Sequence, residues 1–167
     1  GERHKRERKL LNPPFHGARM RSYGSQMQEV ALAEARDWQP GEVVEIHKAM
    51  QRISLNIITR AVFGIIDPAQ GERTRETATE YMESMSPLVL MLPFLARDWF
   101  GLSPWARMQR ARQAFDALLY EQIAARRKQP GGEDILSLLL STRYEDGSGM
   151  SDEQILSELI TLLIAGH

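Results

Sequence analysis

The last stretch of the chain, residues 151–167, reads SDEQILSELITLLIAGH and limits most narrowly what the sequence can fold into. Ser151, followed three residues later by Gln154, is the pattern of a capping box, which starts a helix. After this start nearly every position is apolar, with only three polar interruptions. A helix that is apolar almost all round lies inside a protein, because a surface helix keeps a polar face. The run is also too short, and too polar at its start, to cross a membrane.

The same stretch closes on Ala165, Gly166 and His167, without a basic last turn or a following loop. We therefore expect the chain to be an internal segment of a larger protein, truncated at both ends. Because Gly166 has no side chain, a flat ligand can approach the helix backbone there. The alternative is that Gly166 is only the capping glycine of a core helix.

Apolar residues at helical spacing continue through the rest of the chain, divided by prolines and glycines. We predict a short extended piece at 42–47 and helices over residues 1–11, 17–36, 48–63, 72–85, 103–128 and 133–141. Gly64 is expected to cap the third helix in the left-handed conformation, and Asp67 with Pro68 is expected to form a turn. With no internal repeat and no linker, the sequence predicts one incomplete all-α domain over residues 1–167.

Two of these helices have an apolar side that we expect to be buried. In residues 48–63 this side comprises Met50, Ile53, Ile57, Ile58, Ala61 and Val62. In residues 103–128 it comprises Trp105, Met108, Ala111, Phe115, Leu119 and Ile123.

The composition excludes several classes of protein. The 167 residues carry a net charge of −1, whereas a domain that binds nucleic acid usually has a clear basic excess. The sequence has no cysteine, so this span holds no disulfide and no thiolate ligand for a metal. It shows no signal peptide and no transmembrane run, and we expect a cytoplasmic protein.

Residues 86–99, SPLVLMLPFLARDW, are strongly apolar, but two prolines prevent one continuous helix. Such a segment is a packed loop, a mobile flap over an apolar cavity, or a surface that touches a membrane or an oily substrate. The packed loop is the simplest interpretation from composition.

The first helix contains a candidate binding pair. His4 and Arg8 are four residues apart and share one face of the helix, whereas Lys5, Arg6 and Lys9 point in other directions. A histidine and an arginine one turn apart can donate hydrogen bonds to one or two carboxylates. The alternative is a solvated surface helix with ordinary ion pairs.

Several motifs follow one another in an order typical of a known family. Residues 1–15 read Gly-x-x-His-x-x-x-Arg-basic-Leu-Leu-x-Pro-x-Phe, and residues 41–47 read GEVVEIH ahead of a helix that ends Val-Phe-Gly. Residues 134–140 read DILSLLL, and a polar turn then leads into the helix that ends Ala-Gly-His. In this order and spacing the chain resembles a bacterial cytochrome P-450, from the family's helix C to the middle of its helix I.

The resemblance implies roles for individual residues. His4 and Arg8 match the pair that binds the haem propionates, and Ala165 and Gly166 match the pair beside the distal face of the haem. The segment around residues 86–99 matches the lid of the substrate pocket, which makes Met85, Leu88 and Leu90 candidate substrate neighbours. Lys5, Arg6 and Lys9 match a surface where an electron donor of the ferredoxin or flavodoxin type docks. The thiolate that binds the iron, and with it any metal ligand or catalytic residue, is expected outside this chain.

We therefore expect a fragment, inactive and poorly folded alone, of a haem-dependent monooxygenase. The parent enzyme would insert one oxygen atom of O2 into a hydrophobic fatty acid, alkane or terpenoid, with electrons from a redox partner. The alternative is a non-catalytic all-α ligand-binding module of a regulator, which would explain the helices and an apolar pocket without redox chemistry.

Overall fold

A computed structural model describes residues 18–65, 67–85, 103–144 and 146–166. The predicted helix over 1–11 and the apolar segment 86–99 lie outside these residues. The described ranges form six helices, namely α2 (Ala18–Ala35), α3 (Ile46–Phe63), α4 (Pro68–Ser84), α6 (Pro104–Lys128), α7 (Ile135–Ser141) and α8 (Asp152–Gly166). They contain no strand, only an isolated bridge between Arg143 and Gly149. The all-α prediction is confirmed.

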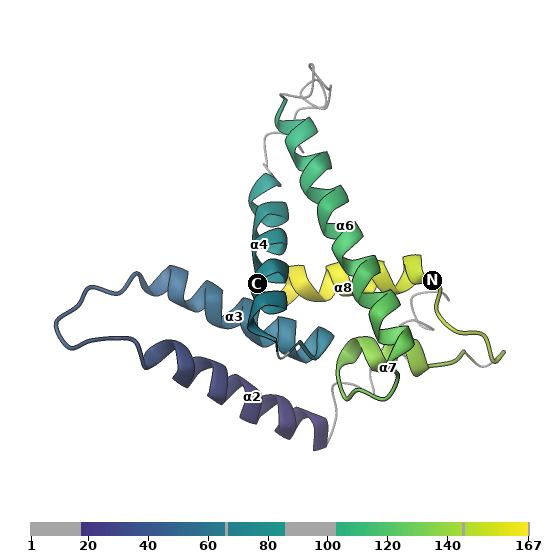
Figure 1. The fold of residues 1–167 in the computed structure, drawn as a ribbon, viewed down its shortest axis with the longest axis horizontal. Helices are drawn as coiled ribbons and strands as arrows, with labels where there is room; N and C mark the ends of the chain where they lie inside the picture. The colour runs from purple at the N-terminus through teal and green to yellow at the C-terminus, as the bar shows by residue number, and fades with distance from the viewer. Residues whose placement is uncertain (1–17, 66, 86–102, 145, 167) are drawn as a thin grey trace.

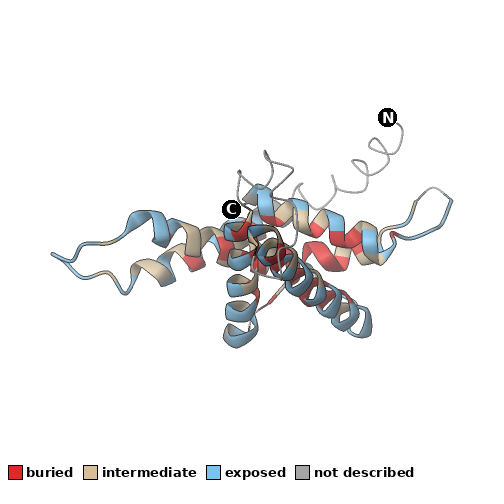
Figure 2. Ribbon diagram, turned by 90° about the horizontal axis from the view of Figure 1, so that it is seen from above, coloured by how far each residue is buried: buried red, intermediate tan, exposed pale blue. Residues whose placement is uncertain are grey.

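The helices form two arms that meet at α8. Helices α2 and α3 lie side by side as one arm, and α4 and α6 lie side by side as the other (Figure 1). Helix α8 packs against α3, α6 and α7 where the arms meet. Buried residues concentrate at this junction, whereas the far end of the α2–α3 arm is exposed (Figure 2).

Helix α8 supplies the centre of the hydrophobic core. Ile155, Leu159 and Leu163 recur at helical spacing and are at most 1% exposed. The predicted capping box is confirmed, because the Gln154 N–H donates to Ser151 Oγ over 3.3 Å and the Ser151 N–H donates to Gln154 Oε1 over 2.8 Å. None of the helices in the described ranges has the length and hydropathy needed to cross a membrane.

Local signals place most helix ends correctly. Ser103 Oγ accepts the Ala106 N–H over 3.1 Å, and Pro104 occupies the first turn of α6. Gly64 ends α3 with φ of +62°, the predicted left-handed cap, and its N–H donates to the Arg60 carbonyl over 2.8 Å.

Two predicted boundaries are wrong. The fourth helix begins at Pro68 rather than at residue 72, because Asp67 caps it by accepting the Gln70 N–H over 2.8 Å. Because the first turn of α4 is polar, hydrophobic spacing did not indicate where this helix begins. The predicted extended piece at 42–47 is also wrong, because α3 already begins at Ile46 and residues 42–45 form no strand.

The predicted buried side of α3 is partly confirmed. Val62 is buried and Ile53, Ile57, Ile58 and Ala61 are half-buried, whereas Met50 is 43% exposed. Ile58 and Ala61 pack against the core. Leu55 and Thr59, which are 2% and 3% exposed, were not predicted. Because α3 packs against α2, α4, α7 and α8, its neighbours decide which positions are covered. On α6, by contrast, four of the six predicted positions are buried, and Trp105 and Met108 are half-buried.

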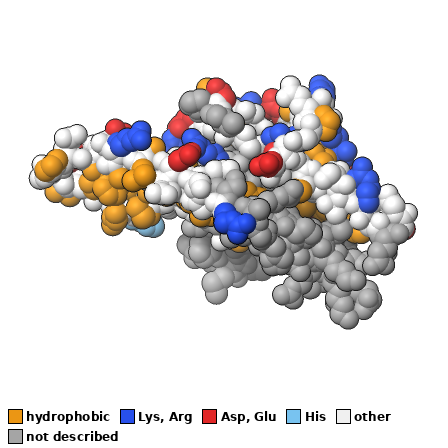
Figure 3. All heavy atoms as spheres, turned by 90° about the horizontal axis from the view of Figure 1, so that it is seen from below, with side chains coloured by type: hydrophobic (Ala, Val, Ile, Leu, Met, Phe, Trp, Pro, Cys, Tyr) orange, Lys and Arg blue, Asp and Glu red, His pale blue; other side chains and the backbone are white. Residues whose placement is uncertain are grey.

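Apolar side chains also gather on the surface of the α2–α3 arm (Figure 3). The large exposed hydrophobic residues of this arm are Met27, Leu32, Val43, Ile46 and Met50. The two large apolar side chains at the start of α3, Ile46 and Met50, are therefore exposed, whereas Ala49 between them is buried.

Candidate functional site

The end of α8 presents a small apolar surface. Ile164 is 45% exposed, Ala165 is exposed, and α8 extends to Gly166. Alanine followed by glycine leaves room for a flat group to lie against the helix backbone. This surface fits the haem macrocycle, which is planar and largely apolar.

The other predicted site residues fall in two groups. His4, Arg8, Lys5, Arg6, Lys9, Leu88 and Leu90 lie outside the described residues. Met85 is described as the C-terminal capping residue of α4, half-buried and packed against the core. The structure therefore describes Ala165, Gly166 and Met85 on two different helices, and does not place the remaining residues beside them.

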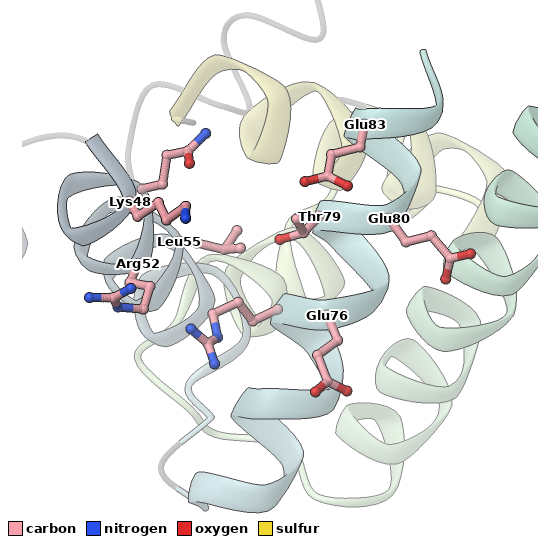
Figure 4. Close-up of a pocket in the computed structure, with 9 residues that line it drawn as sticks. Lys48, Arg52, Leu55, Glu76, Thr79, Glu80 and Glu83 are labelled. Atoms are coloured by element: carbon pink, nitrogen blue, oxygen red, sulfur yellow. The ribbon is translucent and has the colours of Figure 1, made fainter. Parts of the chain in front are cut away.

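A cleft between α3 and α4 was not predicted from the sequence. Its volume is about 490 Å³, and its lining includes Lys48 and Arg52 on α3 and Glu76, Glu80 and Glu83 on α4. Lys48 and Glu83 point toward one another across the cleft, whereas Arg52 and Glu80 point away from it (Figure 4). One feature of the sequence could have indicated this cleft. The glutamates at positions 76, 80 and 83 are four and three residues apart, so they share one helix face.

The positive charges of this cleft already have partners. Lys48 Nζ lies 2.5 Å from Glu45 Oε2, Arg52 forms an ion pair with Glu34, and Arg75 forms one with Glu72. The hydrogen bond and the charge of Lys48 lower the pKa of Glu45. Hydrogen bonding to Glu34 raises the pKa of Arg52.

A second polar cluster, which we call the Arg126 cluster, ties together the ends of three helices. Arg126 Nη2 donates to the Phe63 carbonyl over 2.6 Å and lies 3.1 Å from Asp134 Oδ2. Asp134 caps α7 by accepting the Ser137 N–H over 2.8 Å, and it also accepts the Ser137 hydroxyl over 2.9 Å. With its side chain only 4% exposed, Asp134 is a buried carboxylate whose charge is paired. This cluster is structural.

Gly132 packs against the Arg126 cluster so closely that no side chain fits. An added Cβ would lie 2.2 Å from Asp134 Oδ2, 2.5 Å from Ser137 Oγ and 2.6 Å from Arg126 Nη1. Gly132→Ala is therefore expected to destabilise the full-length protein by about 1–3 kcal/mol, as overpacking does. Denaturant unfolding measures this loss.

Gly24 is the matched control for that substitution. It lies inside α2, and nothing stands within 4 Å of an added Cβ. Gly24→Ala is expected to stabilise the protein by about 0.5–1 kcal/mol, because alanine is the better helix former. A Gly132→Ala variant as stable as the unsubstituted protein would contradict the crowding at Gly132.

Metal-binding side chains are not clustered in the described ranges. No group of three or more His, Asp or Glu residues there is placed to hold a metal ion.

The comparisons with known proteins identify the family. The family model described as Cytochrome P450 matches residues 1–167, the whole chain. The chain belongs to the cytochrome P-450 family. The family's cofactor is haem iron, so the full-length protein holds haem. The regulator-module alternative finds no support in these matches.

Bacterial relatives agree with this assignment. The P-450 chain is 38% identical over its whole length to a Mycobacterium tuberculosis protein named cytochrome P-450 138, and it covers 38% of that protein. It is 31% identical over 98% of its length to cytochrome P-450 135B1 of the same organism, of which it covers 35%. The chain thus spans little more than a third of these relatives.

Solved structures agree in fold. The retinoic acid bound cyanobacterial CYP120A1 matches 100% of the P-450 chain with a TM-score of 0.80 and 25% identity, and 36% of that structure is covered. The Mycobacterium marinum CYP268A2 in complex with pseudoionone matches 99% of the chain with a TM-score of 0.73 and 20% identity, and 37% of it is covered. The predicted resemblance to bacterial cytochromes P-450 is confirmed.

Proposed function

We propose that the full-length protein is a haem-thiolate monooxygenase that inserts one oxygen atom of O2 into a hydrophobic substrate. The observation that carries this proposal is the match of residues 1–167 to the family. The exposed Ala165 near the end of α8 supports it, since we expect Ala165 and Gly166 to flank the haem. When bound, the haem supplies the dioxygen chemistry, and the protein supplies binding, orientation and exclusion of water.

The chain contributes to cofactor binding from both of its ends. Ala165 and Gly166 keep the helix surface flat enough for a planar group to lie against it. His4 and Arg8 donate hydrogen bonds to the propionates, since an arginine fork matches a carboxylate well.

The proposed substrate is a fatty acid, an alkane or a terpenoid. Met85, together with Leu88 and Leu90, would contribute apolar contacts, and the half-buried position of Met85 at the end of α4 is compatible with this role. Retinoic acid, bound by CYP120A1, is an apolar isoprenoid acid and favours the fatty-acid-like and terpenoid classes.

The proposed electron donor is an acidic protein of the ferredoxin or flavodoxin type. Lys5, Arg6 and Lys9 would attract such a donor, and this steering weakens as the ionic strength rises. A cytoplasmic location stays a prediction.

Oxygen incorporation tests the reaction class. The full-length protein, supplied with a reduced ferredoxin and a panel of fatty acids and terpenoids, is incubated under isotopically labelled dioxygen. We expect one labelled oxygen atom per product molecule, measured by mass spectrometry, and no label from isotopically labelled water. Products whose added oxygen derives only from water would contradict the proposal.

The predicted helix over residues 1–11 offers a matched pair of variants for its two proposed roles. Arg8→Ala is expected to lower the haem content of the purified full-length protein, because each lost charged hydrogen bond costs about 1.5–3 kcal/mol. Arg6→Ala should retain haem but slow reduction by the electron donor, with a weaker dependence on salt. The assignment of the two residues would be refuted if Arg6→Ala lost haem and Arg8→Ala did not.

A further inference from the structure

A surface groove lies at the C-terminal end of α6, beside the segment that joins α3 to α4 (Figure 1). Its volume is about 570 Å³, within the range of small-molecule sites. It is separate from the cleft between α3 and α4, because no residue lines both. Part of its lining is apolar and is supplied by Phe63, Ile65 and Leu136. Gln70 at the start of α4 and Gln122 on α6 add amide groups to this lining.

The two glutamine side chains form an incomplete pair. Gln70 Nε2 donates a hydrogen bond to Gln122 Oε1 over 3.1 Å. Two amides that face one another fully would also form the reciprocal bond. Within the described part of the chain, however, neither Gln122 Nε2 nor Gln70 Oε1 has a hydrogen-bond partner. The pair therefore leaves one amide nitrogen and one amide oxygen unused.

The unused nitrogen belongs to a deeply placed side chain. Gln122 is only 8% exposed, and polar groups at such depth are nearly always hydrogen-bonded. The nitrogen is not fully enclosed by protein, and Gln122 lines the groove. It therefore opens into the groove, where a ligand can accept its hydrogen bond.

The charges around the groove favour a neutral ligand. Arg126 Nη2 lies 3.1 Å from Asp134 Oδ2, and Arg73 Nη2 lies 3.0 Å from Glu121 Oε2. Lys128 lies in the last turn of α6, where a positive charge complements the negative end of the helix dipole. An ionic ligand would have to compete with these interactions, whereas a neutral one leaves them intact.

We propose that the groove binds a small neutral molecule that carries a primary carboxamide or a lactam beside an apolar body. The ligand's amide oxygen accepts a hydrogen bond from Gln122 Nε2, and its N–H donates one to Gln70 Oε1. An amide suits this pair because its donor and its acceptor lie side by side. The apolar body packs against the part of the groove lined by Phe63, Ile65 and Leu136. None of the residues that line the groove is a predicted haem or substrate contact.

Benzamide is the probe that tests this site. Its binding to the full-length protein is measured by saturation-transfer NMR, with an azole bound to the haem iron so that the haem pocket is blocked. We expect benzamide to bind under these conditions. N,N-dimethylbenzamide and benzoate have no N–H to donate, so each should bind about two- to ten-fold more weakly, the range for the loss of one hydrogen bond.

Three glutamine variants make the test specific. Gln70→Met and Gln122→Met each remove one amide at nearly constant side-chain length, and each should weaken benzamide binding about two- to ten-fold. Gln113→Met is the matched control, because Gln113 is exposed on α6 and does not line the groove, so binding should not change. Gln70 is exposed to solvent, so Gln70→Met keeps the test decisive if Gln122→Met fails to fold.

Three results would overturn the site. They are no binding of benzamide, equal binding of benzamide and N,N-dimethylbenzamide, and unchanged benzamide binding in Gln70→Met. None of these measurements depends on oxygenase activity, so their outcome leaves the proposed function untouched.

Discussion

Replacing Phe115 with alanine is expected to destabilise the full-length protein by about 3–5 kcal/mol, the usual cost of removing a fully buried aromatic ring. Phe115 is 1% exposed and stacks on Tyr81 with 21° between the ring planes. The substitution removes both the buried apolar area and the stacked contact, and it leaves a cavity between α4 and α6. Denaturant unfolding measures the loss.

Tyr120 provides the comparison on the same helix. Tyr120 is 38% exposed, so Tyr120→Ala removes less buried area than Phe115→Ala and is expected to cost only about 1 kcal/mol. Similar losses for Phe115→Ala and Tyr120→Ala would show that the contact between α4 and α6 is not part of the stable core.

Asp134→Ala is expected to cost about 2–4 kcal/mol. The substitution removes the cap of α7, leaves the Ser137 hydroxyl without its acceptor, and deprives Arg126 of its buried negative partner. The Arg126 side chain is 23% exposed, so water can partly solvate its charge in the variant. The cost is therefore below that of breaking a fully buried ion pair.

Two variants separate the contributions at Asp134. Asp134→Asn keeps a good capping group but loses the charge, so its cost should lie between those of the unsubstituted protein and Asp134→Ala. Asp67→Ala removes a cap from α4 at a residue exposed to solvent, and should cost only about 1 kcal/mol. If Asp134→Ala cost no more than Asp67→Ala, the Arg126 cluster would add nothing to the cap.

Features fixed by neighbours in the sequence could be predicted. The capping box of Ser151 and Gln154, the left-handed Gly64 and the start of α6 at Pro104 each depend on a few adjacent residues. The same holds for the buried side of α6, where the apolar residues form a single stripe that leaves no choice of face.

Features fixed by distant contacts could not be predicted. The hydrogen bond from Arg126 to the Phe63 carbonyl joins residues 63 positions apart. The buried face of α3 depends on which of its apolar sides meets the neighbouring helices, and the cleft between α3 and α4 depends on how two helices cross. Hydrophobic spacing contains none of this information.

The candidate site residues were predicted from the order of the sequence motifs rather than from hydrophobic spacing. Spacing alone left open whether Gly166 is a simple cap and whether His4 and Arg8 are solvated. The order of the motifs resolved the family, which the match over residues 1–167 then established. The individual site residues stay predictions until they are tested.

The spectrum of the reduced full-length protein with carbon monoxide tests the central claim most directly, because it reports the ligand of the haem iron. We predict a stoichiometric haem complex with the long-wavelength Soret band of a thiolate ligand. A protein that binds no haem, or gives only the spectrum of a histidine-ligated iron when freshly prepared and fully folded, would contradict the assignment of a haem-thiolate monooxygenase.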